Sequence, residues 1–184
     1  MGCGKSFVLS CFSDLGWAVI DCDDISRDLM DNDADTISAV RGRFGDAYFD
    51  EQGRLNRKML AKLVFNETEA LDDLEKILGP KINQKWMDFL ATTPKNTPAI
   101  VEIPLLFEKN LEKFFDISVC VTVDEETQLA RLAKRGFGKN EALLRIKTQL
   151  PIGEKELRAD FAITNNGNKD FTRTQVALLA SRIH

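Results

Sequence analysis

The chain has 184 residues, of which 43% are hydrophobic and 29% charged, and its formal net charge is −4. This length fits one domain with insertions better than two independent domains. An acidic chain without a Lys/Arg-rich run is not expected to bind nucleic acid or an anionic membrane surface. The only histidine is His184, which argues against histidine-based catalysis.

The four cysteines form no C-x-x-C pair, so neither a zinc site nor a disulfide framework is expected. No stretch reaches the ~20 apolar residues of a membrane span, and the first residues do not have the pattern of a signal peptide. We therefore expect a cytoplasmic protein.

Hydrophobic periodicity divides the chain into helices and strands. The first predicted helix runs from Lys5 to Leu15 and is followed by an apolar strand at 17–20 and an acidic segment at 21–24. A helical stretch from about Asp33 to Thr93 follows; its predicted helices are 33–44, 57–65 and 69–90, the last interrupted at Gly79-Pro80. Beyond it, the predicted strands are 99–103, 117–123 and 161–164, and the predicted helices are 127–134, 140–149 and 172–182. Apolar strands that alternate with helices predict an α/β fold with a parallel sheet, and the helical stretch is predicted to be an insertion.

A phosphate-binding motif opens the chain. Gly2-Cys-Gly-Lys-Ser6 is the second half of G-x-x-x-x-G-K-[ST], and it leads directly into the first helix. In that motif backbone N–H groups and a helix start hold phosphates, the Lys contacts β/γ-oxygens and the Ser binds Mg²⁺. The alternative is an ordinary solvated helix start.

The motif is incomplete, because its first Gly would precede Met1 and no strand enters the loop. We therefore expect Met1 to be an internal residue of the natural protein. The strand before it would be central in the sheet, beside the strands at Val19 and at Ile100 or Val119.

Further motifs in a fixed order resemble those of dephospho-CoA kinases over essentially the whole chain. The most specific is Ile103-Pro-Leu-Leu-Phe-Glu108, which matches that family's I-P-L-L-F-E segment in full. The other matches are Val19–Asp23, Phe44-Gly45, Gly53–Arg57, Val64-Phe65, Gln128–Arg135, Arg145-Ile146, Gln149 and Ala159–Gly167. The sequence departs from the family pattern at Phe7 (usually Thr), Glu102 (often Asp), Gly79 (usually His) and Thr164 (commonly Asp).

The resemblance implies a P-loop kinase-like three-layer α/β/α fold with a parallel sheet, a helical acceptor-binding insertion and a small lid. It implies a single kinase domain over residues 1–184, with a core at 1–30 and 97–184, a CoA-binding insertion at about 31–96 and a lid at about 131–150. The implied activity is the ATP-dependent phosphorylation of the ribose 3′-hydroxyl of dephospho-CoA, which gives coenzyme A and ADP. ATP and dephospho-CoA are then the small-molecule partners, Mg²⁺ is the cofactor, and the protein is expected to be a monomer or a weak homo-oligomer.

The same resemblance implies roles for single residues. The implied catalytic residues are Asp23, Lys5 and Arg135. The implied ATP-binding residues are Gly2, Cys3, Gly4, Lys5, Ser6, Phe7, Arg131, Arg135 and Asn165, with Ser6 also the metal ligand. The implied acceptor-binding residues are Asp23, Arg57 and Leu105. We further expect the thiol of Cys3 to border the ATP phosphates, where bulky thiol reagents would reach it.

Chemistry supports some of these roles and leaves alternatives open. A carboxylate just past a parallel strand faces the ligand crevice, which favours Asp23 as the group that accepts the hydroxyl proton. The acidic residues at 21–24 could instead cap the next helix, and capping is expected of Asp24. Arg131 and Arg135 are four residues apart and share a helix face, which suits either phosphate binding or a solvated surface.

Two other functions are compatible with parts of the sequence. Because the phosphate motif is incomplete, the chain could be a catalytically impaired relative that at most binds a nucleotide. Another small P-loop kinase, for a nucleoside or a shikimate-like acceptor, would explain the loop but not the segment at 103–108.

Overall fold

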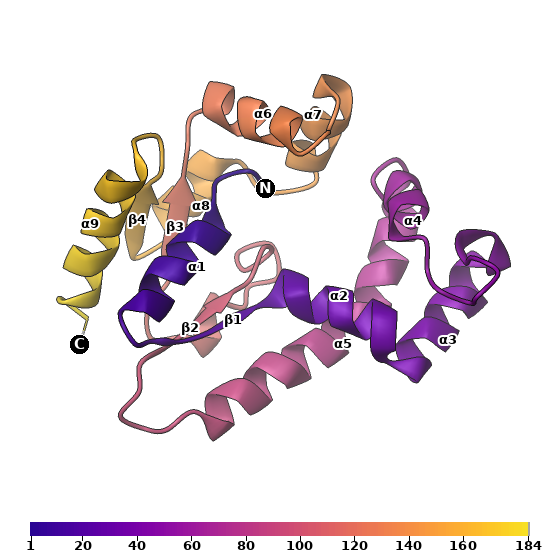
Figure 1. Cartoon of the computed structure of the whole chain (residues 1–184), viewed down its shortest axis with the longest axis horizontal. Helices are drawn as coiled ribbons and strands as arrows, with labels where there is room; N and C mark the ends of the chain where they lie inside the picture. Colours follow the sequence, from indigo (N-terminus) through magenta and orange to yellow (C-terminus); the bar gives the residue numbers. More distant parts are fainter. Residues whose placement is uncertain (184) are drawn as a thin grey trace. The chain divides into compact units, whose positions relative to one another are not determined.

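The computed structural model describes residues 1–183 (Figure 1). The first half of the chain contains α1 (Lys5–Asp14), β1 (Ala18–Asp21), α2 (Cys22–Asn32), α3 (Ala34–Phe44), α4 (Arg57–Val64) and α5 (Thr68–Thr92). The second half contains β2 (Ala99–Glu102), β3 (Val119–Thr122), α6 (Glu125–Lys134), α7 (Lys139–Lys147), α8 (Ile152–Arg158), β4 (Phe161–Thr164) and α9 (Lys169–Ala180). Short 3₁₀ turns lie at Asp46–Tyr48 and Glu112–Phe114. This set of helices and strands confirms the α/β class.

The chain divides into two compact units. Residues 1–20 together with the chain from Thr93 onward form the first, which we call the strand unit. Residues Asp21–Thr92 form the second, the helical unit. The helical unit therefore begins at the end of β1, earlier than the boundary near residue 31 that the sequence suggested, because α2 belongs to it.

The helical unit is built on a small apolar cluster formed by α3, α4 and α5. Val40, Leu60, Val64 and Ala70 are its buried members. Helix α5 is continuous from Thr68 to Thr92, so the interruption predicted at Gly79-Pro80 is wrong. Pro80 lacks a backbone N–H and removes one helical hydrogen bond. The remaining turns continue on both sides and bury Leu78 and Trp86, which offsets that loss.

Asp33 connects two helices of this unit. Its carboxylate caps α3 by accepting the backbone N–H of Thr36 at 2.8 Å, and it pairs with the ammonium of Lys81 in α5. These partners, first Lys81 and then Thr36, lower the pKa of Asp33 to about 2.

Asp33→Asn should therefore destabilise the helical unit in a pH-dependent way. Because the folded-state pKa lies below the ordinary value of 3.8, the carboxylate stabilises the fold above about pH 4, and this contribution is lost as the pH falls toward about 2. The urea midpoint of the variant, followed by circular dichroism, should be lower than that of the parent at neutral pH and should approach it near pH 2. Asp35→Asn, in the same helical turn, is the matched control and should show a smaller difference. A loss from Asp33→Asn that is equal at both pH values would contradict this role.

The strand unit contains two separate pairs of strands, β1 with β2 and β3 with β4. The second pair is parallel, with Val119 opposite Phe161 and Thr122 opposite Thr164. One apolar core nevertheless joins the two pairs through α1 and α9. Its fully buried members include Phe12, Ile163 and Val176, and Val19 and Ile100 pack against it.

Within residues 1–183, β2 and β3 do not pair with each other. A cavity of about 90 Å³ lies along β3 and the residues that follow β2; Val119, Val121, Ile103, Cys3 and Met1 are among its lining residues. Ala99, Ile100 and Val101 of β2 are only half-buried, although central strands of parallel sheets are normally buried on both faces. The strands thus form two half-sheets over one core.

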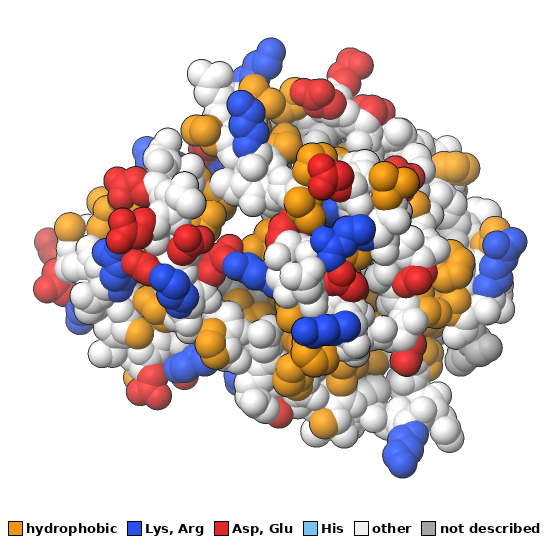
Figure 2. All heavy atoms as spheres, turned by 180° about the vertical axis from the view of Figure 1, so that it is seen from behind, with side chains coloured by type: hydrophobic (Ala, Val, Ile, Leu, Met, Phe, Trp, Pro, Cys, Tyr) orange, Lys and Arg blue, Asp and Glu red, His pale blue; other side chains and the backbone are white. Residues whose placement is uncertain are grey.

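Among residues 1–183, no helix is both long enough and apolar enough to cross a membrane. On the face visible in Figure 2, acidic and basic side chains are interspersed with hydrophobic ones.

Candidate active site

The segment that carries the predicted phosphate motif forms a loop that ends at the first turn of α1. Gly2 and Gly4 have left-handed backbones, with φ of 78° and 83°. Within the described chain, no side chain caps α1 and its first turn contains no acidic residue. The positive end of the helix dipole is thus left for an anion. The side chain of Ser6 is exposed in this first turn.

Three side chains from distant parts of the sequence hold this loop by its backbone. The carbonyl oxygen of Cys3 accepts hydrogen bonds from Arg131 Nη1 at 3.2 Å and from Asn165 Nδ2 at 2.8 Å. Gln128 Nε2 donates to the carbonyl oxygen of Met1 at 2.5 Å. The structure therefore brings Cys3, Arg131 and Asn165 together, and the contact is made by the backbone carbonyl of Cys3 and not by its side chain.

Gly4 is required by this arrangement. A Cβ atom at position 4 would collide with Asn165 Nδ2 and would lie 3.3 Å from Arg131 Nη1. The left-handed φ adds strain for any residue with a side chain. Glycine thus allows the clamp on the loop to close.

The motif lysine has an acidic neighbour. Lys5 Nζ lies 3.1 Å from Glu102 Oε1, and the side chain of Glu102, at the end of β2, is only 8% exposed. The ammonium is thus held at the start of α1 by a buried carboxylate, where phosphate oxygens would replace or share that contact.

The expectation for the Cys3 thiol is wrong. Cys3 is 5% exposed, and its sulfur lies 3.7 Å from the carbonyl oxygen of Met1 and 3.9 Å from Gln128 Nε2. It lines the cavity beside β3, together with Cys120, whose pKa is raised to about 11 by burial and then by Cys3. The thiol therefore faces the interior and is shielded from bulky reagents, and only the backbone of Cys3 belongs to the loop surface.

The two arginines of α6 differ in environment. Arg131 is half-buried and also donates from Nη2 to the carbonyl oxygen of Asn165 at 2.8 Å. Arg135 is the C-cap of the same helix and is exposed. Arg131 therefore supports the loop, whereas Arg135 is available to a ligand.

Phe7 packs on the core below the loop, with Lys169 and Arg173 each 5.5 Å from its ring centre.

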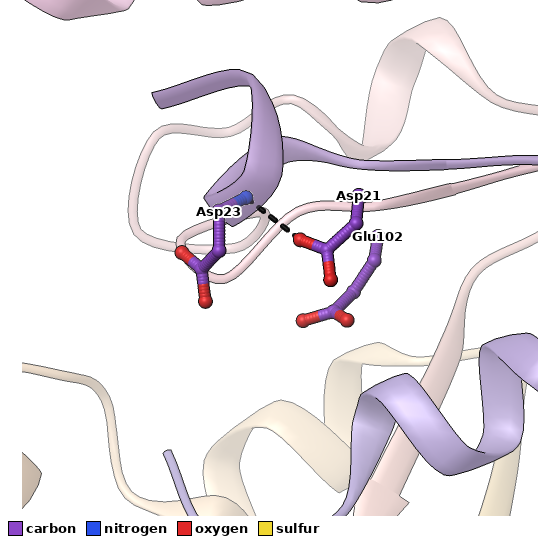
Figure 3. Close-up of side chains that lie close together, drawn as sticks. All are labelled: Asp21, Asp23 and Glu102. Atoms are coloured by element: carbon purple, nitrogen blue, oxygen red, sulfur yellow. Dashed lines mark hydrogen bonds between the residues drawn. The ribbon is translucent and has the colours of Figure 1, made fainter. Parts of the chain in front are cut away.

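In the helical unit, Asp21 is the residue that caps α2. Its Oδ1 accepts the backbone N–H of Asp23 at 2.7 Å (Figure 3). The same oxygen also accepts the backbone N–H of Asp24 at 3.4 Å. The capping role expected of Asp24 is therefore wrong, because Asp21 is in an extended conformation just before the helix, as a cap must be. Asp23 is exposed in the first turn of α2, directly after β1. Figure 3 also labels Glu102, which belongs to the strand unit.

The remaining predicted residues lie in different units. Arg57, at the start of α4 in the helical unit, pairs with Asp31, its Nη1 lying 3.3 Å from Oδ2. Leu105 is half-buried in the strand unit. Their roles toward an acceptor remain proposals.

Sequence reasoning missed two contributors to the loop. Gln128 belongs to a family motif without a predicted contact to the loop, yet it is 4% exposed and its Nε2 donates to the carbonyl oxygen of Met1. Thr172 is fully buried and donates from Oγ1 to Asn165 Oδ1 at 2.9 Å. The family motif pointed to Gln128, whereas no pattern in the sequence singled out Thr172.

Comparison with known proteins places these features in a family. The family model for dephospho-CoA kinase matches residues 1–170. The dephospho-CoA kinase of Syntrophotalea carbinolica is 37% identical over 186 residues, which cover 100% of this chain and 88% of that protein. The dephospho-CoA kinase of Geobacillus kaustophilus is 37% identical over 176 residues, which cover 94% of this chain and 88% of that protein.

Solved structures agree with this assignment. The dephospho-CoA kinase from Campylobacter jejuni superposes with a TM-score of 0.70 at 28% identity, covering 100% of this chain and 92% of that one. A Thermus thermophilus protein superposes with a TM-score of 0.78 at 31% identity, covering 98% of this chain and 93% of that one. These likenesses confirm the predicted P-loop kinase-like fold, and the chain belongs to the dephospho-CoA kinase family.

Proposed function

We propose that this chain transfers the γ-phosphoryl group of ATP to the ribose 3′-hydroxyl of dephospho-CoA and releases coenzyme A and ADP. The observation that best supports this is the phosphate loop, which ends at an uncapped helix start and is held by Asn165 and Arg131. Phosphoryl transfer depends mainly on positioning and on electrostatic stabilisation, and such a loop provides both.

On the nucleotide side, the loop amides and Lys5 bind the phosphates. The contact between Lys5 Nζ and Glu102 Oε1 restricts the rotamers of Lys5 before the phosphates bind. The exposed hydroxyl of Ser6 is an oxygen ligand of the kind that Mg²⁺ prefers, and Ser6 would hold that ion. When bound, Mg²⁺ neutralises charge on the β- and γ-phosphates.

On the acceptor side, Asp23 orients the ribose hydroxyl and accepts its proton. Its carboxylate is exposed, and its place at the carboxyl end of β1 is where α/β enzymes bind ligands. Arg57 of the helical unit and the half-buried Leu105 of the strand unit are the other candidate acceptor-binding residues. Residues 131–150 act as a lid, and the exposed Arg135 stabilises charge on the transferring group.

The alternative is a nucleotide-binding module without turnover. Within the described part of the chain β2 and β3 do not pair with each other, which favours it, because we expect a sheet in two halves to stabilise the loop less than a continuous one. Both proposals predict ATP binding, but only the kinase requires a site for dephospho-CoA.

Thermal unfolding with single ligands separates these functions. A ligand that binds only the folded state raises the melting temperature by mass action. We expect Mg·ATP and dephospho-CoA each to raise it, and shikimate to have no effect. Lys5→Ala should remove the ATP shift and leave the dephospho-CoA shift. A shift with ATP alone would favour the binding module, and a shift with shikimate in place of dephospho-CoA would indicate a different kinase.

A further inference from the structure

Asn165, the residue after β4, uses all four of its polar groups inside the strand unit. Its backbone N–H donates to the carbonyl of Thr122 at 2.9 Å, and its own carbonyl accepts from Arg131 at 2.8 Å. Its side-chain Nδ2 donates to the carbonyl of Cys3 at 2.8 Å, and Oδ1 accepts from the hydroxyl of Thr172 at 2.9 Å. Asn165 is 5% exposed, so its place and orientation are fixed by protein groups.

The bond to the Cys3 carbonyl determines the direction of the next amide. The structure has no cis peptide bond within residues 1–183, so the carbonyl of Cys3 and the N–H of Gly4 point in opposite directions across one planar unit. Because Asn165 and Arg131 draw the oxygen to one side, the N–H of Gly4 points to the other side. It donates to no acceptor among residues 1–183, and it stands at the start of α1, where an anion binds.

Thr172 supports the orientation in which Nδ2 of Asn165 faces the loop, because its hydroxyl satisfies the amide oxygen at the other end. Its hydroxyl donates to Oδ1, which leaves Nδ2 directed at the Cys3 carbonyl. If the amide turned over, Oδ1 would face the carbonyl oxygen of Cys3 and two acceptors would repel each other. Thr172 is 0% exposed, so this hydrogen bond lies in the interior of the strand unit.

We propose that Thr172 is a positioning residue for nucleotide binding: acting through Asn165, its hydroxyl fixes the Cys3–Gly4 peptide so that the Gly4 amide faces the ATP phosphates. Thr172 itself touches no ligand. The proposal rests on the proposed function in requiring that the loop bind ATP, but it does not require an acceptor or turnover.

Isothermal titration of the full chain with ATP and Mg²⁺ tests this role. Thr172→Val keeps the shape of the side chain and removes the donor, and we expect ATP to bind about 3- to 10-fold more weakly, the effect of one hydrogen bond. Thr172→Ser keeps the donor and should bind ATP like the parent chain, although loss of the methyl group lowers its melting temperature. Thr174→Val is the matched control: it makes the same change in α9, but its hydroxyl donates only to the backbone carbonyl of Asp170.

The outcomes are distinct. Weak binding by Thr172→Val, with normal binding by Thr172→Ser and Thr174→Val, supports the positioning role, since both Thr172 variants lose stability but only one loses affinity. Equal affinity of Thr172→Val and the parent chain would overturn it, as would equal weakening in Thr172→Ser. Absence of ATP binding by the parent chain would instead contradict the proposed function.

Discussion

Asp23→Asn is expected to lower kcat for dephospho-CoA by about 10²- to 10⁴-fold, the usual contribution of a general base. Asparagine keeps the size and much of the hydrogen bonding of aspartate but cannot accept the hydroxyl proton. ATP affinity should change little, because the loop amides, Lys5 and Ser6 bind the phosphates. Steady-state kinetics with both substrates varied, together with ATP titration, measures the two effects separately.

Lys5→Ala should behave differently. Its ammonium contacts phosphate in the ground state and in the transition state, so nucleotide binding and turnover should fall together. Removal of Lys5 also leaves the buried carboxylate of Glu102 without the partner that lies 3.1 Å away, which adds a loss of stability.

Asp24→Asn is the matched control for Asp23→Asn. Asp24 lies in the same first turn of α2, is exposed, and pairs with Arg27. Its neutralisation should leave kcat within a few-fold of the parent value. If Asp23→Asn retained near-normal turnover with both substrates saturating, Asp23 would be structural and the base would have to be another carboxylate.

The second large effect concerns the two half-sheets. Among residues 1–183, β2 pairs only with β1 and β3 only with β4, and a cavity lies along β3 and the residues that follow β2. We expect that an added strand would pair with these open edges. Met1 lines that cavity, so an extension joined to its amino group would begin beside β3. About five buried apolar side chains at ~1.5–3 kcal/mol each amount to on the order of 10 kcal/mol, which is comparable to the whole stability of a domain.

We therefore expect an extension of about five β-branched residues before Met1 to raise the urea midpoint strongly. An extension of equal length made of Gly and Ser is the control and should have little effect, because it has no apolar side chains to bury. Hydrogen exchange should show new protection at Val119 and Val121 and in β2 with the apolar extension only. The same midpoint for both extensions would mean that the cavity does not accept a strand.

Local signals in the sequence predicted much of the fold. Helix α3 lies between Asp33, which caps it, and Gly45, as its sequence indicated, and β4 has the predicted bounds. No range is predicted for helix α2, although the acidic residues at 21–24 are considered as caps of the next helix, because its sequence is strongly acidic and has few apolar residues. Its buried residues are Cys22 and Leu29. The sequence predicts a break at Gly79-Pro80, whereas α5 is continuous and buries Leu78 and Trp86. In both helices tertiary contacts decide what local propensity does not.

The candidate site was predictable to the extent that it lies in a motif. Motifs in the sequence identify the loop at 2–6 and the residues Arg131 and Asn165. They do not reveal that both side chains donate to the backbone carbonyl of Cys3 and so hold the loop. Which side of the loop the Cys3 thiol faces depends on the backbone turn at Gly2 and Gly4. The contact of Thr172 with Asn165 depends on how α9 packs against β4, which no spacing in the sequence encodes.

The most direct test of the account is identification of the product that the purified chain forms from ATP and dephospho-CoA. Mass spectrometry should show dephospho-CoA gaining one phosphoryl group, phosphorus NMR should place that group on the ribose 3′-oxygen, and ADP should form in equal amount. ADP formation without a phosphorylated acceptor, or no turnover by a chain that binds both substrates, would contradict the proposed kinase.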